Sequence, residues 1–226
     1  IGDSGEVALI VQDSVSGNAR ERAEAFRQEI AEGHPGVSIV ETIYMDQLDE
    51  MKRQAAAEEL GVTSEELAAW TEAASGLGEG SDSDAKGEAI SEEAKTKLED
   101  IDSVAGAMSG EEAAAYYLSK HPELKGCFGT NADAVTLGLE ALRTMEQSEE
   151  IALVGIDAGK EQLEALEAGE IDGLVVQNPF GMGYATVVAA ARTILEIGNE
   201  AVVDTGYTWV DKENMEDGSV QMMLYE

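Results

Sequence analysis

The stretch IALVGIDAGKEQLEALEAGEIDGLVVQ, residues 151–177, decides the fold class. It holds two short apolar runs, 151–156 and 173–177, separated by a segment with helical spacing that ends at Gly169. Three further β-rich runs, each followed by a helix candidate, precede them at residues 7–12, 36–43 and 124–130. Apolar strands that alternate with helices are typical of a parallel sheet covered on both faces, because a crossover between parallel strands needs a helix. The sequence therefore predicts an α/β fold with a parallel sheet sandwiched by helices.

Composition and charge limit the kinds of molecule that the chain can bind. The chain has 226 residues, 43% of them hydrophobic, which suffices for one large domain or two small ones. Acidic residues outnumber basic ones 47 to 14, and the formal net charge is −33. Such a surface repels polyanions, so nucleic acid is excluded as a partner. The charge fits solubility in a salty or extracellular medium, but a general acidic bias of the source explains it equally well.

The strand–helix alternation breaks between residues 46 and 110. This segment is acidic and rich in Ala and Glu, and Thr63 and Glu66 have the spacing of a capping box. The Gly/Ser/Asp run at 75–88 indicates a mobile loop between two helices. We therefore predict an acidic helical insertion at residues 46–109.

Candidate ligand-binding residues follow from the predicted sheet. In parallel α/β sheets the ligand crevice lies beyond the carboxyl ends of the strands. The polar residues expected at that edge are Gln12, Asp13, Arg20, Arg22, Tyr44, Asp46, Asn131, Asp157 and Gln177. Amides donate and accept, carboxylates accept from paired hydroxyls, and guanidinium donates, which together suit a sugar or another polyol. Each residue also has a local interpretation: Asn131 and Asp157 could cap helices, and Arg22 could offset acidic neighbours.

The same inspection predicts no catalytic residue, no metal site and no cofactor. The chain lacks a Ser/His/Asp set, and its two histidines, His34 and His121, both precede prolines in loops. Cys127 stands in an apolar strand and is expected to fill the core. A magnesium-dependent phosphotransferase using Asp13, Asp46 or Asp157 is disfavoured, because the neighbouring carboxylate and lysine that it needs are missing. We therefore expect a binding protein and not an enzyme.

Four stretches resemble the type 1 periplasmic sugar-binding proteins, close to the ribose-binding, CUT2-type receptors of ABC transporters. They are GNARERAEAF (17–26), FGTNADAVTLGLEAL (128–142), ALVGIDAGKEQLEALEAGEIDGLVVQNPFGMGY (152–184) and DTGYTWVDKENM (204–215). The resemblance implies that Arg22 grips the sugar and that Asn131, Asp157 and Gln177 contact it. It also implies a Rossmann-like lobe.

The resemblance divides the chain as follows. Residues 1–45 and 110–178 would form the sugar-binding C-terminal lobe, and 46–109 would be inserted into it. The helix at 179–200 would belong to an N-terminal lobe that this sequence lacks, and 201–226 would form a hinge strand and tail. We therefore expect a longer native polypeptide, with the missing lobe as the partner of this one.

The function implied by the resemblance is capture of a sugar between two lobes and its delivery to an ABC permease. The location would be extracytoplasmic, either periplasmic or as a cell-surface lipoprotein. The alternative is the sugar-sensing core of a LacI-type transcription regulator, which the tail at 204–215 and the acidity disfavour. Trp70 in the insertion either stacks on the sugar ring or packs the insertion's own core.

Overall fold

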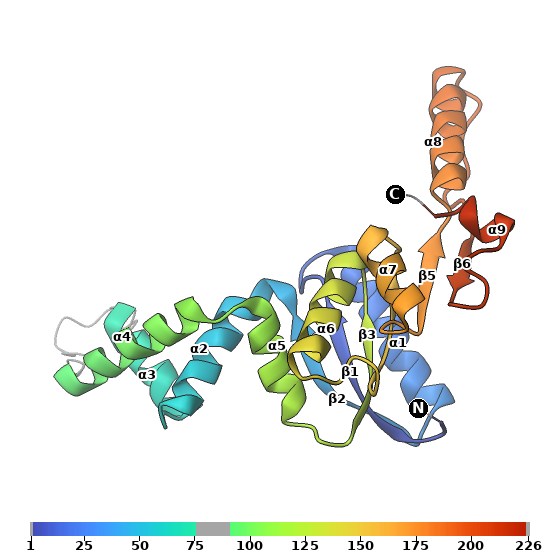
Figure 1. Cartoon of the computed structure of the whole chain (residues 1–226). Coiled ribbons are helices and arrows are strands. Elements are labelled where there is room, and N and C mark those ends of the chain that lie inside the picture. Colours follow the sequence, from blue (N-terminus) through green and yellow to red (C-terminus); the bar gives the residue numbers. More distant parts are fainter. Residues whose placement is uncertain (1, 76–90, 225–226) are drawn as a thin grey trace.

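A six-stranded sheet forms the centre of the molecule (Figure 1). The structure, a computed structural model, describes residues 2–75 and 91–224. The strands are β1 (Gly5–Val11), β2 (Val37–Tyr44), β3 (Leu124–Gly129), β4 (Ala152–Ile156), β5 (Gly173–Gln177) and β6 (Tyr207–Val210). Their order is β2-β1-β3-β4-β5-β6; the first five are mutually parallel and β6 runs antiparallel to β5. The predicted α/β fold with a mostly parallel sheet is confirmed.

Helices cover both faces of this sheet. They are α1 (Gly17–Gly33), α5 (Gly110–Ser119), α6 (Ala132–Thr144) and α7 (Lys160–Ala168). Side chains alternate between the faces of a strand, so Leu9 and Val11 of β1 pack under α1, while Ala8 and Ile10 join the core beneath the other helices. Residues Val7 to Val11 of β1 are thus buried on both faces of the sheet.

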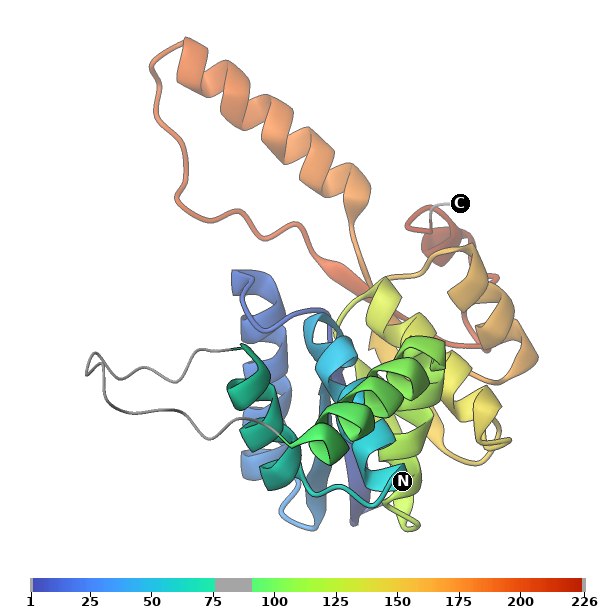
Figure 2. The ribbon, with the colours of Figure 1, turned by 90° about the vertical axis from the view of Figure 1, so that its left-hand side faces the viewer.

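The segment after β2 forms a helical arm that projects from the sheet (Figures 1 and 2). It consists of η1 (Met45–Gln47), α2 (Leu48–Glu59), α3 (Ser64–Ser75) and α4 (Glu92–Ala107). The arm has its own apolar cluster around Ile101, which is fully buried, and Trp70 packs against that cluster. Trp70 therefore packs the arm's core, which leaves the stacking role without support. Most of the loop predicted at 75–88 lies outside the described residues.

Polar contacts fix the arm to the lobe. The carboxylate of Glu58 in α2 accepts hydrogen bonds from the Tyr116 hydroxyl and from Lys120 Nζ, both at 2.7 Å. The bond to Glu58 raises the pKa of Tyr116 to about 12.

The predicted capping box within the arm is also present: Glu66 N–H donates to Thr63 Oγ1, and Glu66 Oε2 accepts from Thr63 N–H.

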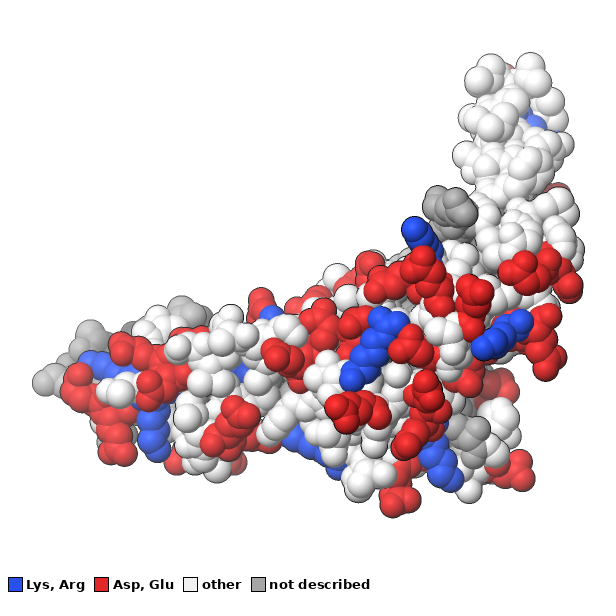
Figure 3. Space-filling view, viewed as in Figure 1, with Lys and Arg blue, Asp and Glu red and all other residues white. Residues whose placement is uncertain are grey.

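The C-terminal segment contains one part that is packed against the lobe and one that is exposed. Val210, the last residue of β6, and Met215 and Val220 beyond it are buried in the main core, so the tail with α9 (Gly218–Gln221) packs against the lobe. By contrast, α8 (Pro179–Ile194) leaves the sheet after β5 and has no buried residue. Its surface is almost free of charge in Figure 3.

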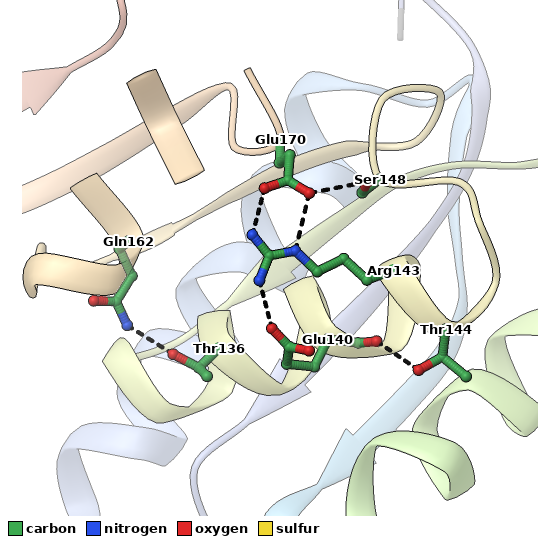
Figure 4. A network of polar contacts seen from close by, with 7 residues as sticks. All are labelled: Thr136, Glu140, Arg143, Thr144, Ser148, Gln162 and Glu170. Carbon is green, nitrogen blue, oxygen red and sulfur yellow. Dashed lines mark hydrogen bonds and ion pairs between the residues drawn. The ribbon is translucent and has the colours of Figure 1, made fainter. Parts of the chain in front are cut away.

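A network of hydrogen bonds and ion pairs surrounds Arg143 near the C-terminal end of α6 (Figure 4). Arg143 Nε donates to Glu170 Oε1 at 2.9 Å, and a second guanidinium nitrogen donates to the other oxygen of the same carboxylate. Arg143 also bonds Glu140 at 2.6 Å, and Ser148 donates to Glu170 at 3.2 Å. The network ties the end of α6 to the loop between α7 and β5.

Because the arm has its own core, a cavity made in that core should destabilise the arm and leave the sheet unaffected. Ile101→Ala removes a fully buried side chain and should cost the arm about 2–5 kcal/mol. Hydrogen exchange followed by mass spectrometry should quicken at least ~10-fold in α2 and α4, while β3 keeps its protection. Glu99→Ala on the exposed face of α4 is the control. Equal loss of protection in β3 would contradict the independence of the two cores.

The Arg143 network predicts a pH-dependent contribution to stability. The hydrogen bond from Arg143 lowers the pKa of Glu170 below its ordinary 4.5. Glu170→Gln should therefore lower the free energy of unfolding by about 0.5–1 kcal/mol at pH 7. A depressed carboxylate pKa stabilises the fold above 4.5, and this contribution is lost as pH falls through the folded-state pKa. Urea titrations of both proteins should converge once the pH has fallen below the folded-state pKa of Glu170, whereas Glu167→Gln should differ little from the parent at pH 7.

Candidate ligand-binding site

The strand register places the candidate residues along one edge of the sheet. Gly129 of β3 pairs with Gly155 of β4, and two further residues along each strand stand Asn131 and Asp157. Adjacent strands lie about 4.8 Å apart, so these two residues are neighbours at the carboxyl edge. Gln177 closes the next strand, β5.

Asp157 and Gln177 meet directly. Gln177 Nε2 donates to Asp157 Oδ1 at 2.7 Å, and both residues are partly exposed. Asp157 has φ of +76°, a left-handed conformation that an ordinary side chain adopts only at a cost. Its N–H donates to Val175 O at 2.9 Å, which holds this conformation. Within the described chain, Asp157 Oδ2 accepts no hydrogen bond and can receive a ligand hydroxyl.

Arg22 and Asn131 lie at the same edge of the sheet. We call Arg22, Asn131, Asp157 and Gln177 together the rim. Arg22 lies in the second turn of α1, and its guanidinium donates to the carbonyl of buried Thr130 at 2.7 Å. Asn131 caps α6, since its Oδ1 accepts from Ala134 N–H at 3.0 Å. The capping interpretation of Asn131 is therefore correct, and it leaves the Nδ2 group as a donor for a ligand. Helix capping uses the oxygen of the Asn131 side-chain amide, and ligand binding would use its nitrogen.

Asp13 and Asp46 lie at the same edge but are engaged with the loop between β1 and α1. Asp13 accepts from the N–H groups of Val15 and Ser16 and from the Ser16 hydroxyl. The Ser16 bonds lower the pKa of Asp13. Asp46 accepts from the N–H and hydroxyl of Ser14 at 3.1 and 2.7 Å. Both carboxylates thus hold the loop that leads to Arg22, and a direct ligand contact of either remains a prediction.

Sequence reasoning missed two residues that shape this rim. Thr130 receives Arg22 on its carbonyl, and its hydroxyl accepts from Gln12 N–H at 3.2 Å. Ser14 links the first loop to Asp46. Their only signal in the sequence is position: Thr130 is the last residue of the predicted run 124–130, and Ser14 stands two residues after the run 7–12. Arg20, in contrast, is exposed and lines a pocket with Ser14, Arg27 and Tyr44.

The rim can bind polar groups, and its residues form no nucleophilic centre. Arg22 and Asn131 Nδ2 supply donors, Asp157 supplies an acceptor, and Gln177 supplies an amide. Burial raises the pKa of the Cys127 thiol to about 12, which keeps it protonated. Among residues 2–75 and 91–224, no group of His, Cys, Asp and Glu is arranged to hold a metal ion. In the same residues no helix combines the length and apolar character needed to span a bilayer.

A parallel α/β lobe with a polar rim at the strand ends is the architecture of periplasmic binding proteins. Residues 88–199, which include β3 to β5 and α8, match the model of the periplasmic binding protein domain. The family resemblance inferred from the sequence is therefore confirmed. A search of curated protein sequences found no significant match.

Solved structures of sugar receptors share the fold. A carbohydrate transporter solute-binding protein from Agrobacterium radiobacter, in complex with D-arabinose, superimposes with a TM-score of 0.63 at 21% identity, covering 98% of this chain and 56% of that one. An ABC transporter solute-binding protein from Agrobacterium vitis, with α-D-tagatopyranose, gives 0.64 at 22%, covering 100% and 56%. An arabinose-binding protein from Geobacillus stearothermophilus gives 0.59 at 18%, covering 99% and 58%.

These comparisons set the scope of the likeness. The chain spans 56–58% of the length of these three proteins. At such identities the similarity establishes the fold, while the ligands in those structures belong to those proteins.

The left-handed backbone at Asp157 predicts a difference between two substitutions. Asp157→Ala should lower the free energy of unfolding by about 1 kcal/mol, because alanine tolerates positive φ poorly. Asp157→Asn should stay within about 0.5 kcal/mol of the parent, because asparagine adopts this region readily. Chemical denaturation measures both, and equal losses in the two variants would contradict backbone strain at this position.

Proposed function

We propose that this chain is the sugar-binding C-terminal lobe of a solute-binding receptor of an ABC transporter. The observation that carries the proposal is the common placement of Arg22, Asn131, Asp157 and Gln177 at one edge of the sheet, all partly exposed. A sugar presents adjacent hydroxyls that donate and accept, and the rim offers both kinds of partner. A rim made only of carboxylates would suit a cation instead.

The geometry of each residue supports this assignment. Asp157 Oδ2 and Asn131 Nδ2 keep hydrogen-bonding capacity after their contacts within the chain are counted. Arg22 is held in place by Thr130 and does not have to be ordered on binding. A pre-organised site spends less free energy on fixing side chains. The sugar would therefore meet a half-site that is already assembled.

We further propose that a second lobe faces this rim and packs on α8. Large apolar side chains are exposed on α8, among them Phe180 at 79%, Tyr184 at 67% and Ile194 at 81%. Soluble monomers rarely leave so continuous an apolar surface open. The 56% coverage of the sugar receptors leaves room for such a lobe. Closure of the two lobes would exclude water and complete the ring of contacts.

Delivery to a permease and an extracytoplasmic location belong to the same proposal. Solute-binding proteins of ABC transporters are what the fold resembles, and residues 88–199 match the periplasmic binding protein domain. The net charge of −33 disfavours the transcription-regulator alternative, because a strongly acidic partner domain hinders approach to DNA.

Calorimetry on the polypeptide containing both lobes tests the proposal. After a screen of pentoses, hexoses and small polyols identifies a ligand, Arg22→Ala, Asn131→Ala and Asp157→Ala should each weaken binding by about 1.5–3 kcal/mol, since a buried polar group on the sugar loses its partner. Arg53→Ala and Asp102→Ala, which remove the same residue types from the arm, are the controls. Unchanged affinity in all three rim variants would refute the site.

A further inference from the structure

A fully buried hydroxyl group lies directly beneath the rim. Among the described residues, the buried polar side chains are Thr130, which is fully buried, and Gln162, which is 5% exposed. Thr130 follows β3 and precedes Asn131 of the rim. A buried hydroxyl costs free energy unless it forms a hydrogen bond, and valine has the same branched shape without that group. The hydroxyl of Thr130 is therefore expected to serve a purpose other than packing.

The backbone around Thr130 is held from both sides. Its N–H donates to Ile10 O at 3.0 Å, which extends the pairing of β1 and β3 beyond the last register pair, Ile10 with Gly129. On the other side, Asn131 caps α6, and its carbonyl accepts from Val135 N–H at 2.9 Å. The peptide group between Thr130 and Asn131 therefore has a fixed orientation, and so has the carbonyl of Thr130.

Thr130 binds both ends of the segment that carries Arg22. Gln12 is the first residue after β1, and the chain runs from it through the first loop into α1. Gln12 N–H donates to Thr130 Oγ1 at 3.2 Å, and the guanidinium of Arg22 donates to Thr130 O at 2.7 Å. Residues 12 and 22 are thus attached to the same buried residue, one through its hydroxyl and one through its carbonyl.

We propose that Thr130 is a positioning residue of the sugar site, which acts through Arg22. Its hydroxyl fixes the start of the first loop, its carbonyl fixes the guanidinium, and together they set the direction from which Arg22 meets a sugar. The role rests on the proposed function, because it concerns the same site. A loose arginine would lose conformational entropy when a sugar ordered it, so the two hydrogen bonds raise the affinity by ordering Arg22 beforehand.

The order of Arg22 can be measured without a sugar. In ¹⁵N NMR relaxation on the 226-residue chain, the Nε–Hε group of Arg22, assigned by its disappearance in Arg22→Lys, should show restricted motion. Thr130→Val keeps the shape and removes the acceptor of Gln12 N–H, so the squared order parameter of this group should fall below ~0.6. Thr130→Ser keeps the hydroxyl and should retain the order of the parent. Equal order in the parent and in Thr130→Val would overturn the proposal, whatever the chain binds.

The effect on affinity is measured by calorimetry on the polypeptide containing both lobes. The probe is the tightest binder among D-ribose, D-xylose, D-glucose and sorbitol. Thr130→Val should weaken binding about tenfold, which corresponds to ~1.4 kcal/mol, and Thr130→Ser should restore the affinity of the parent. In the Arg22→Ala background, Thr130→Val should cause little further loss, because the residue acts through Arg22. Losses that add in the double variant would contradict that route.

A matched control separates positioning from general loss of stability. Ile151→Val removes one methyl group from a buried residue directly before β4, at the opposite end of that strand from Asp157. It should lower the stability of the lobe and leave the affinity unchanged. Equal weakening in Ile151→Val and Thr130→Val would overturn the positioning role.

The variants also distinguish this proposal from the proposed function. If Arg22→Ala weakens binding and Thr130→Val does not, the positioning role fails and the sugar site stands. If Arg22→Ala binds the probe as tightly as the parent, both fail. Chemical denaturation verifies that each variant is folded.

Discussion

Close packing of α6 on β3 and β4 is the constraint on which the rest of the structure depends. Val135 of α6 lies directly over Gly129 and Gly155, the paired glycines of the two strands. A Cβ at Gly129 would come within 2.7 Å of Val135, and one at Gly155 would overlap it. The absence of side chains at these two positions lets the first turn of α6 approach the sheet. Asn131, which caps that turn, is thereby placed at the edge beside Asp157.

This constraint explains how much of the site the sequence could predict. Strand ends are visible as apolar runs that stop at a polar residue, and Asn131, Asp157 and Gln177 all satisfy that pattern. The parallel register then brings them to one edge without further information. Three features of the site could not be read from the sequence. They are the cap made by Asn131 Oδ1, the hydrogen bond between Gln177 and Asp157, and the positive φ of Asp157.

Other features were less accessible because they depend on tertiary contacts. The strand expected within residues 201–226 rested on the family resemblance alone, because the run at 207–210 is short and mostly exposed. It forms β6 through antiparallel pairing with β5. Asp13 and Asp46 looked like ligand residues from position alone, but neighbouring N–H and hydroxyl groups already engage them. The helical arm could be expected from the broken alternation of strands and helices, whereas the contacts of Glu58 with Tyr116 and Lys120, which hold it against the lobe, could not.

The carboxyl edge of the sheet carries side chains of both charges. Helix N-termini favour negative side chains, and both α6 and α5 begin with an acidic residue in the first turn. Above the strands, the guanidinium of Arg22 and the amides of Asn131 and Gln177 lie at the same edge as Asp157. The neighbours of the helix ends differ as well: the arm supplies Leu48 on one side, and α1 supplies Arg22 on the other. Asp46 in η1 also accepts a hydrogen bond from Ser14 in the loop before α1. The root of the arm is therefore tied to the loop that leads to Arg22.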